Sequence, residues 1–167
     1  MRRIAGRYTY RRVDADGIDA VGPLWKKLIK HHSRLLAHSD GKARNRKFAT
    51  RKQELLAKAD GGGLMIELVR HNVRGPYVAY CIASVSHGGA GEIDSLFVDE
   101  AHRGLGIGTR LMRRALAWLD RSGAQSKMIS VVYANSEAIR FYSQFGFLPA
   151  TVQLKQKTRA RRQTSVR

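Results

Sequence analysis

Hydrophobic and polar positions recur with different periods along the chain, which separates expected strands from expected helices. Segment 8–13 is rich in strand-forming residues and predicts a first strand. Apolar residues then recur at helical spacing, which predicts a helix over 14–36 that Asp14 or Asp16 can cap. A second helix is expected over residues 44–59, because a run of glycines breaks the pattern directly afterwards.

The middle of the chain carries three apolar runs separated by short turns. These runs predict strands at residues 64–69, 77–85 and 92–98. Because the turns are short, we expect each strand to run antiparallel to its neighbour.

After the third of these strands, the pattern predicts helices alternating with strands. From Ile107 onward, apolar residues occupy one helical face and arginines the other, and Gly123 ends this helix. The strand expected at 128–133 runs parallel to its predecessor, because a helix separates the two. We expect Ser136 to cap a short helix, and residues 147–155 to form a last strand.

The expected order of elements is therefore β-α-α-β-β-β-α-β-α-β. It indicates a single α/β domain with a mixed, mostly antiparallel sheet and helices on both faces. A chain of 167 residues can bury its apolar surface in one core. It has no apolar stretch of the roughly 20 residues that a membrane helix needs. No apolar signal-peptide run follows the basic start, so we expect a cytoplasmic protein with no membrane partner.

Charge is large and unevenly placed, with a net value of +18 at pH 7. Residues 1–60 contain 16 Lys and Arg against 6 Asp and Glu, whereas residues 61–152 contain 9 against 7. Residues 153–167 add six basic residues and no acidic one, and we expect a mobile basic tail over 158–167. Basic flanks attract polyanions, which makes nucleic acid a candidate partner; the alternative is a surface that is only well solvated.

A glycine-rich segment, 98–109, joins the third of these strands to the amphipathic helix. Its Gly-x-Gly-x-Gly spacing differs from the Gly-x-Gly-x-x-Gly of dinucleotide-binding folds, and no lysine follows Gly108 as a P-loop requires. Glycines let backbone N–H groups approach a ligand, and a helix start favours phosphate. The segment predicts a phosphate-binding turn with Arg103 as an added charge; the alternative is a tight turn without a ligand.

Two motifs resemble the GNAT superfamily of N-acetyltransferases. That family's strand-to-helix pattern, Arg/Gln-x-x-Gly-x-Gly/Ala, is matched by Arg103-Gly104-Leu105-Gly106-Ile107-Gly108. A second block is matched by residues 133–147, with an Asn, then Ala-Ile-x-x-Tyr, then Gly-Phe. The resemblance covers 64–155 as a cofactor-binding core and leaves 1–60 as the variable acceptor side of a domain over 1–157. One departure is Ala101, where many members carry proline.

The resemblance implies acetyl-CoA as the cofactor, no metal, and a sheet that splays between its fourth and fifth strands. The pyrophosphate would lie on the backbone of the glycine turn, and the pantetheine arm along the main chain of the preceding strand. The residues concerned are Leu96, Phe97, Val98, Arg103, Gly104, Leu105, Gly106, Ile107, Gly108 and Thr109. Asn135 is implied to contact the cofactor at the splay, and Tyr142 to protonate the leaving thiolate. Helical spacing alone would make Tyr142 a core residue.

An attacking amine must first lose a proton, so a carboxylate or an ordered water is expected beside it. Glu92 and Asp94 lie two apart on one predicted strand and so share a face. The resemblance implies that a carboxylate on this strand serves as the base, commonly through water. We favour Glu92 for its reach and leave Asp94 and a water open. His31, His32 and His38 end the first helix near the implied acceptor site, where a helix C-terminus also favours cations.

We therefore expect an N-acetyltransferase that moves an acetyl group from acetyl-CoA to a primary amine by direct attack in a ternary complex. The single cysteine, Cys81, lies in an apolar run and is expected to be buried and inert. The acceptor is a small-molecule or peptide amine, and the few acids in residues 1–60 favour an amine beside an anionic group over a polycation. The alternative is a nucleic-acid- or ribosome-associated binding module on the same fold.

Overall fold

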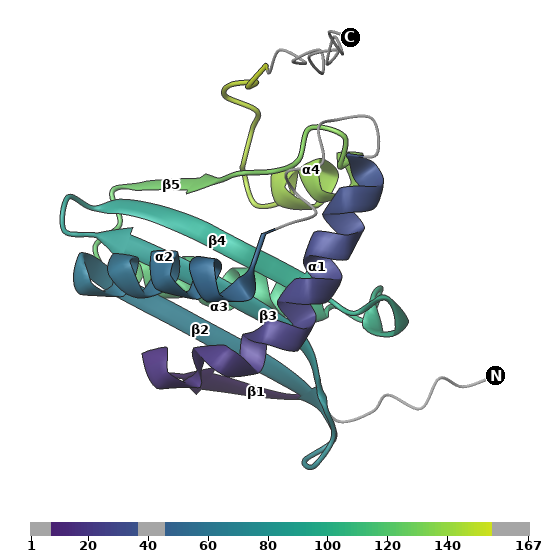
Figure 1. The fold of residues 1–167 in the computed structure, drawn as a ribbon. Coiled ribbons are helices and arrows are strands. Elements are labelled where there is room, and N and C mark those ends of the chain that lie inside the picture. The colour runs from purple at the N-terminus through teal and green to yellow at the C-terminus, as the bar shows by residue number, and fades with distance from the viewer. Residues whose placement is uncertain (1–7, 37–45, 155–167) are drawn as a thin grey trace, which may run out of the picture.

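The computed structural model describes residues 8–36 and 46–154, which fold around one five-stranded sheet (Figure 1). The strands are β1 Tyr8–Val13, β2 Gly62–His71, β3 Tyr77–Ser86, β4 Ala90–Val98 and β5 Ser126–Ile129. They lie side by side in chain order, antiparallel from β1 to β4, with β5 parallel to β4.

Helices cover both faces of this sheet. They are the 3₁₀ segment η1 Ala15–Val21, α1 Gly22–Leu35, α2 Phe48–Asp60, the short 3₁₀ segment η3 Glu100–His102, α3 Ile107–Arg121 and α4 Ser136–Ser143. The apolar side of α3, with Leu111 and Met112, packs on one face of the sheet against Cys81 and Ile93. Residues of η1, α1 and α2 pack on the other face around Tyr80. The expected α/β class, with a mostly antiparallel sheet between helices, is confirmed.

One carboxylate is buried inside the sheet layer beneath α3. Glu67 of β2 has no exposed side-chain area, and Arg114 of α3 donates from Nε to its Oε1 at 2.5 Å. The second oxygen, Oε2, is buried with no hydrogen-bond partner. This ion pair ties α3 to β2. In the part of the chain that the structure describes, no helix is long and apolar enough to cross a membrane.

The N-terminal helices begin differently from the sequence prediction. The expected helix over 14–36 is two elements, η1 and α1, because Pro23 at the start of α1 lacks the N–H that a continuous helix would need. Asp14 precedes η1 but makes no side-chain cap. The second helix begins at Phe48, and the first positions predicted for it, 44 and 45, lie outside the described residues.

The C-terminal strand is not observed. Residues 147–154 form no strand, contrary to the prediction, and Lys155 and the expected tail over 158–167 lie outside the described residues. Phe147 packs against the core, but Leu148 and Leu154 are 79% and 89% exposed, so the apolar residues beyond Phe147 are not buried as those of a sheet strand would be. A strand also needs a neighbour for its backbone groups, and β5 is itself only four residues long.

A bulge in β4 shapes the sheet next to its divergence from β5. In the β3–β4 register, Ile82 faces Ser95 and Ala83 faces Ile93, which leaves Asp94 without a partner. As a result Asp94 and Ser95 both face the α1–α2 side: Asp94 contacts Lys58 of α2, and the Ser95 hydroxyl lies 2.6 Å from that of Tyr80. Pairing between β4 and β5 stops at Ile93, directly before the bulge.

Candidate active site

A cavity of about 540 Å³ opens where β4 and β5 diverge. The pairing of the two strands ends at Ile93 and Ile129, and segments 94–98 and 130–132 form facing walls beyond that point. The turn before α3, the helix α4 and the C-terminal part of α1 supply the remaining walls. Beyond Ile93 the structure describes no strand on this side of β4, so its outer backbone groups have no strand partner there, and the carbonyl of Val98 is bound by Arg103 instead.

The glycine turn has a backbone that only glycine adopts readily. Gly104 and Gly106 have φ of 73° and 75°, and a Cβ added at either would meet no atom within 4 Å. Gly106 is the N-cap of α3, so the first N–H groups of that helix lack partners in the helix itself and face an open space. Gly108 has no positive φ, and a Cβ there would make an ordinary contact of 3.4 Å with the ring of Phe141.

The other predicted residues of this turn fall into two groups. Arg103, Ile107 and Thr109 line the cavity, whereas Leu105 is 42% exposed and stands outside its wall. Arg103 donates from Nε to the carbonyl of Val98 at 3.0 Å, which fixes the turn against the end of β4. The predicted phosphate-binding turn is thus built at the mouth of a cavity, at a helix N-terminus.

Two predicted residues come from α4 and the segment before it. Asn135 lines the cavity, and its Oδ1 accepts a hydrogen bond from the N–H of Ala138 at 3.1 Å. Asn135 is therefore the N-cap of α4, and the prediction that Ser136 caps this helix is wrong. Tyr142 is 8% exposed and also lines the cavity. Burial raises the pKa of its phenol above the ordinary value, which keeps the hydroxyl protonated.

Both candidate carboxylates are held by α2. Lys58 Nζ lies 2.5 Å from Glu92 Oε2 and 2.5 Å from Asp94 Oδ1, and Arg51 contacts the same Asp94 oxygen at 3.4 Å. Asp94 has no exposed side-chain area and its Oδ2 is buried without a partner. Burial alone would lower the pKa of Lys58, but its hydrogen bonds to the two carboxylates raise it above the usual value. Of the two acids, Asp94 belongs to the cavity wall and Glu92 does not.

The acceptor side of the cavity includes the end of α1. Leu28, His31 and His32 line it. Burial and the nearby charge of Arg103 lower the pKa of His31, and burial and His31 lower that of His32. Both rings are therefore mainly neutral at pH 7. The third histidine of this group, His38, lies outside the described residues.

His102 is a cavity residue that the sequence analysis did not identify. Its Nδ1 lies 2.9 Å from the hydroxyl of Tyr8, and its ring lies 5.2 Å from that of His71. The only signal in the sequence was its position directly before Arg103, because Tyr8 is 94 residues away. This contact fixes the ring beside the glycine turn.

Among the described residues the cavity has neither a cluster of metal ligands nor a cysteine nucleophile. Within residues 8–36 and 46–154, no group of three His, Cys, Asp or Glu could hold a metal ion. Cys81 is fully buried in the core, where burial raises the pKa of its thiol. The thiol is therefore poorly placed to attack a substrate in the cavity.

Comparison with known proteins identifies the family. The model of the acetyltransferase (GNAT) family matches residues 25–147. An uncharacterized N-acetyltransferase of Methanocaldococcus jannaschii is 28% identical over 142 residues, which make up 84% of this chain and 60% of that protein. The chain thus spans less than two thirds of the length of this relative.

Solved structures share the fold at low identity. A GCN5-related N-acetyltransferase from Ralstonia eutropha JMP134 has a TM-score of 0.68 and 22% identity, over 90% of this chain and 99% of the other. An aminoglycoside N-acetyltransferase solved in complex with CoA has a TM-score of 0.60 and 16% identity, over 91% and 100%. The family model spans more than half of the sequence and includes the glycine turn, the bulged strand and Tyr142. The chain belongs to the GNAT family of acetyltransferases.

Proposed function

We propose that the protein is an N-acetyltransferase that transfers the acetyl group of acetyl-CoA to a primary amine. The observation that carries the proposal is a single cavity that unites the glycine turn, the open edge of β4 and the phenol of Tyr142. A protein of the same fold has been solved with CoA. The identity of the acceptor is a separate question, because the similar structures include enzymes for chemically different amines.

The cofactor end of the cavity is assigned to the turn from Arg103 to Thr109. The positive φ of Gly104 and Gly106 turns the backbone so that a phosphate can approach without meeting a side chain. The start of α3 adds N–H donors and the favourable end of the helix dipole. The open edge of β4, from Leu96 to Val98, is suited to an amide-containing arm that binds as an extra strand would.

The acid of the reaction is assigned to Tyr142. Acetyl-CoA supplies a thioester, whose carbonyl carbon an uncharged amine can attack. The departing sulfur then needs a proton, and the raised pKa of Tyr142 keeps one available on its hydroxyl at neutral pH. In the described residues no group hydrogen-bonds this hydroxyl, so it is free to turn toward a ligand.

The base is assigned to Asp94, acting through a water. This reverses the sequence-based preference for Glu92, because Asp94 lines the cavity and has an oxygen without a partner. Lys58 and Arg51 fix the other oxygen, which orients the group. Asn135 keeps a position on the cavity wall where its amide can contact the cofactor, although its Oδ1 already caps α4.

The proposal is tested by ligand-dependent melting and by release of CoA thiol. Acetyl-CoA should raise the melting temperature by mass action, whereas NADH and ATP should do so weakly. Free thiol should then appear when a panel of primary amines is added. Equal stabilisation by all three nucleotides, with no thiol released by any amine, would show only attraction to a basic surface.

A further inference from the structure

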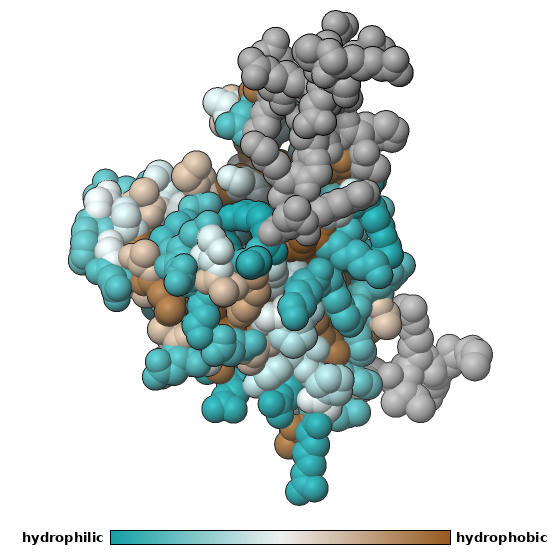
Figure 2. Space-filling view, in the orientation of Figure 1, coloured by the Kyte–Doolittle hydropathy of each residue, from teal (hydrophilic) through white to brown (hydrophobic). Residues whose placement is uncertain are grey.

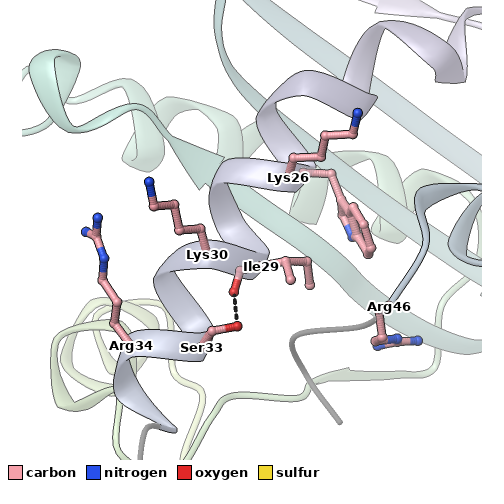
Figure 3. A pocket seen from close by; sticks show the side chains of 7 residues that line it. Lys26, Ile29, Lys30, Ser33, Arg34 and Arg46 are labelled. Carbon is pink, nitrogen blue, oxygen red and sulfur yellow. Dashed lines mark hydrogen bonds between the residues drawn. The ribbon is translucent and has the colours of Figure 1, made fainter. Parts of the chain in front are cut away.

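Helix α1 separates two cavities. Leu28, His31 and His32 line the active-site cavity, and a second cavity of about 670 Å³ lies on the other side of the helix (Figure 3). Successive helical residues turn by about 100°. Trp25 and Ile29, which line the second cavity, therefore point away from His31.

The exposed side of α1 carries a positive stripe without ion pairs, and the residues of this stripe also line the second cavity. Lys26, Lys30 and Arg34, which we call the basic stripe, follow one another at four-residue intervals and are all exposed. Within the described part of the chain no ion pair or hydrogen bond involves their charged groups. Figure 3 shows Lys30 and Arg34 pointing to the side of the helix away from Arg46.

Within the described residues no acidic side chain forms an ion pair with this stripe. The sequence of α1 contains no acidic residue. Its fourth cation, Lys27, pairs with Asp99, and Arg46 across the second cavity is bound to Glu54 at 3.0 Å. Figure 2 shows hydrophilic residues over the exposed side of α1. The stripe is therefore a local source of positive potential, with Glu100 and Glu137 close enough to its Arg34 end to act on His31.

The basic stripe adjoins the acceptor end of the active site. Arg34 lies about 60° from His31 around the helix axis, so the last cation of the stripe is next to the cavity wall. From Lys26 to Arg34 the stripe extends about 12 Å along the helix. This length exceeds what a single phosphate or carboxylate can cover.

We infer that the acceptor amine belongs to an acidic peptide segment that binds along the basic stripe and places its amine in the active-site cavity. The inference rests on the proposed function. A polycationic acceptor would be repelled by the stripe, whereas acidic side chains spaced along a peptide would be attracted by it. A peptide also supplies an aliphatic amine, whereas the exocyclic amines of nucleobases are conjugated with the ring and are weak nucleophiles.

The chemical step conserves atoms and charge. The amine gives up one proton toward Asp94, its nitrogen forms a bond to the acetyl carbon, and the carbon–sulfur bond breaks. The sulfur takes a proton from Tyr142, and the products are an N-acetylated peptide and free CoA. The basic stripe takes no part in these bonds and acts only on binding of the peptide.

The test compares three synthetic peptides of equal length, each with one free amine, flanked by acidic, neutral or basic residues. Free CoA thiol is measured to give kcat/KM at low salt and at high salt. We expect kcat/KM for the acidic peptide to exceed that for the neutral one by roughly tenfold at low salt. The advantage should shrink at high salt, because exposed charges are screened.

Two variants test whether the basic stripe causes the preference for the acidic peptide. The triple substitution Lys26→Ala, Lys30→Ala, Arg34→Ala should lower kcat/KM for the acidic peptide roughly tenfold and leave the neutral peptide unchanged. The matched control removes three exposed arginines elsewhere, Arg74, Arg113 and Arg121, and should change neither. In both variants the stabilisation by acetyl-CoA should equal that of the wild type.

Several outcomes would overturn the inference. One is preference for the neutral or basic peptide; another is acetylation of small amines with none of the peptides modified. Loss of an oligonucleotide's binding in the stripe variant, with peptide acetylation unchanged, would make the stripe a nucleic-acid surface. A raised KM for acetyl-CoA in that variant would assign the stripe to the cofactor. The proposed function itself fails only if no amine is acetylated and acetyl-CoA does not bind.

Discussion

The substitution Gly106→Ala tests whether the glycine turn contacts acetyl-CoA, because its effect on ligand binding can be measured apart from its effect on folding stability. Gly106 has a φ of 75°, and a Cβ at this position would meet no atom within 4 Å. An alanine here therefore removes no packing and costs only the strain of a left-handed conformation, about 1–2 kcal/mol. In a protein of this size, that strain corresponds to a fall of about 2–8 °C in melting temperature.

The added methyl group would occupy the space assigned to the pyrophosphate. At a concentration about 100 times its Kd, acetyl-CoA should stabilise the wild type by about 2.7 kcal/mol. This corresponds to a rise of about 5–11 °C in melting temperature, which a thermal-shift assay resolves easily. We expect Gly106→Ala to remain folded and to lose most of this rise.

Gly123→Ala is the matched control, at the other end of α3. Gly123 has a φ of 77° and an equally open Cβ position, but it is not part of the cavity wall. Without ligand, the melting temperature of Gly123→Ala should fall by the same amount as that of Gly106→Ala. With acetyl-CoA, it should show the full rise of the wild type. A full rise in both variants would refute the assignment of the turn, and loss in both would mean that strain alone weakens binding.

Three further predictions test the chemistry and the core. Tyr142→Phe should lower kcat by roughly 10²–10³ with little change in the KM for acetyl-CoA. An unchanged kcat would show that Tyr142 is not the general acid. The acetyl-transfer rate of Asp94→Asn should be partly restored at alkaline pH, because alkali supplies free amine. Restoration in Glu92→Gln alone would identify Glu92 as the base. Arg114→Met should lower the free energy of unfolding by roughly 2–3 kcal/mol in urea titrations, because Glu67 stays buried; the loss is below that of a fully buried pair, since Arg114 is 40% exposed. No change in the urea midpoint would mean that the pair does not stabilise the fold.

The features that the sequence predicted well are those set by local chemistry. The turn at Gly104 and Gly106 is one, because a positive φ restricts the residue type and leaves a readable spacing. The amphipathic helix after it is another, since its apolar period depends on its own residues alone. Predictions of this kind needed no knowledge of what lies across the fold.

The features that were missed depend on partners distant in sequence. Lys58 reaches Glu92 and Asp94 from 34 and 36 residues away, so the competition of a cation for both carboxylates could not be read from their spacing. The bulge at Asp94 depends on the register with β3. The segment 147–154 has a strand-like pattern but no neighbour, and a pattern alone does not supply one.

The two outer strands of the sheet also bear on how copies of the protein behave when concentrated. An unpaired strand edge is a template on which another chain can add, and short or charged edge strands limit such growth. β1 exposes Arg11 and Arg12, and β5 has only four residues, among them Lys127. Neither edge offers a long, flat, uncharged ladder. Edge-to-edge polymerisation is therefore disfavoured by mutual repulsion at one edge and by lack of length at the other.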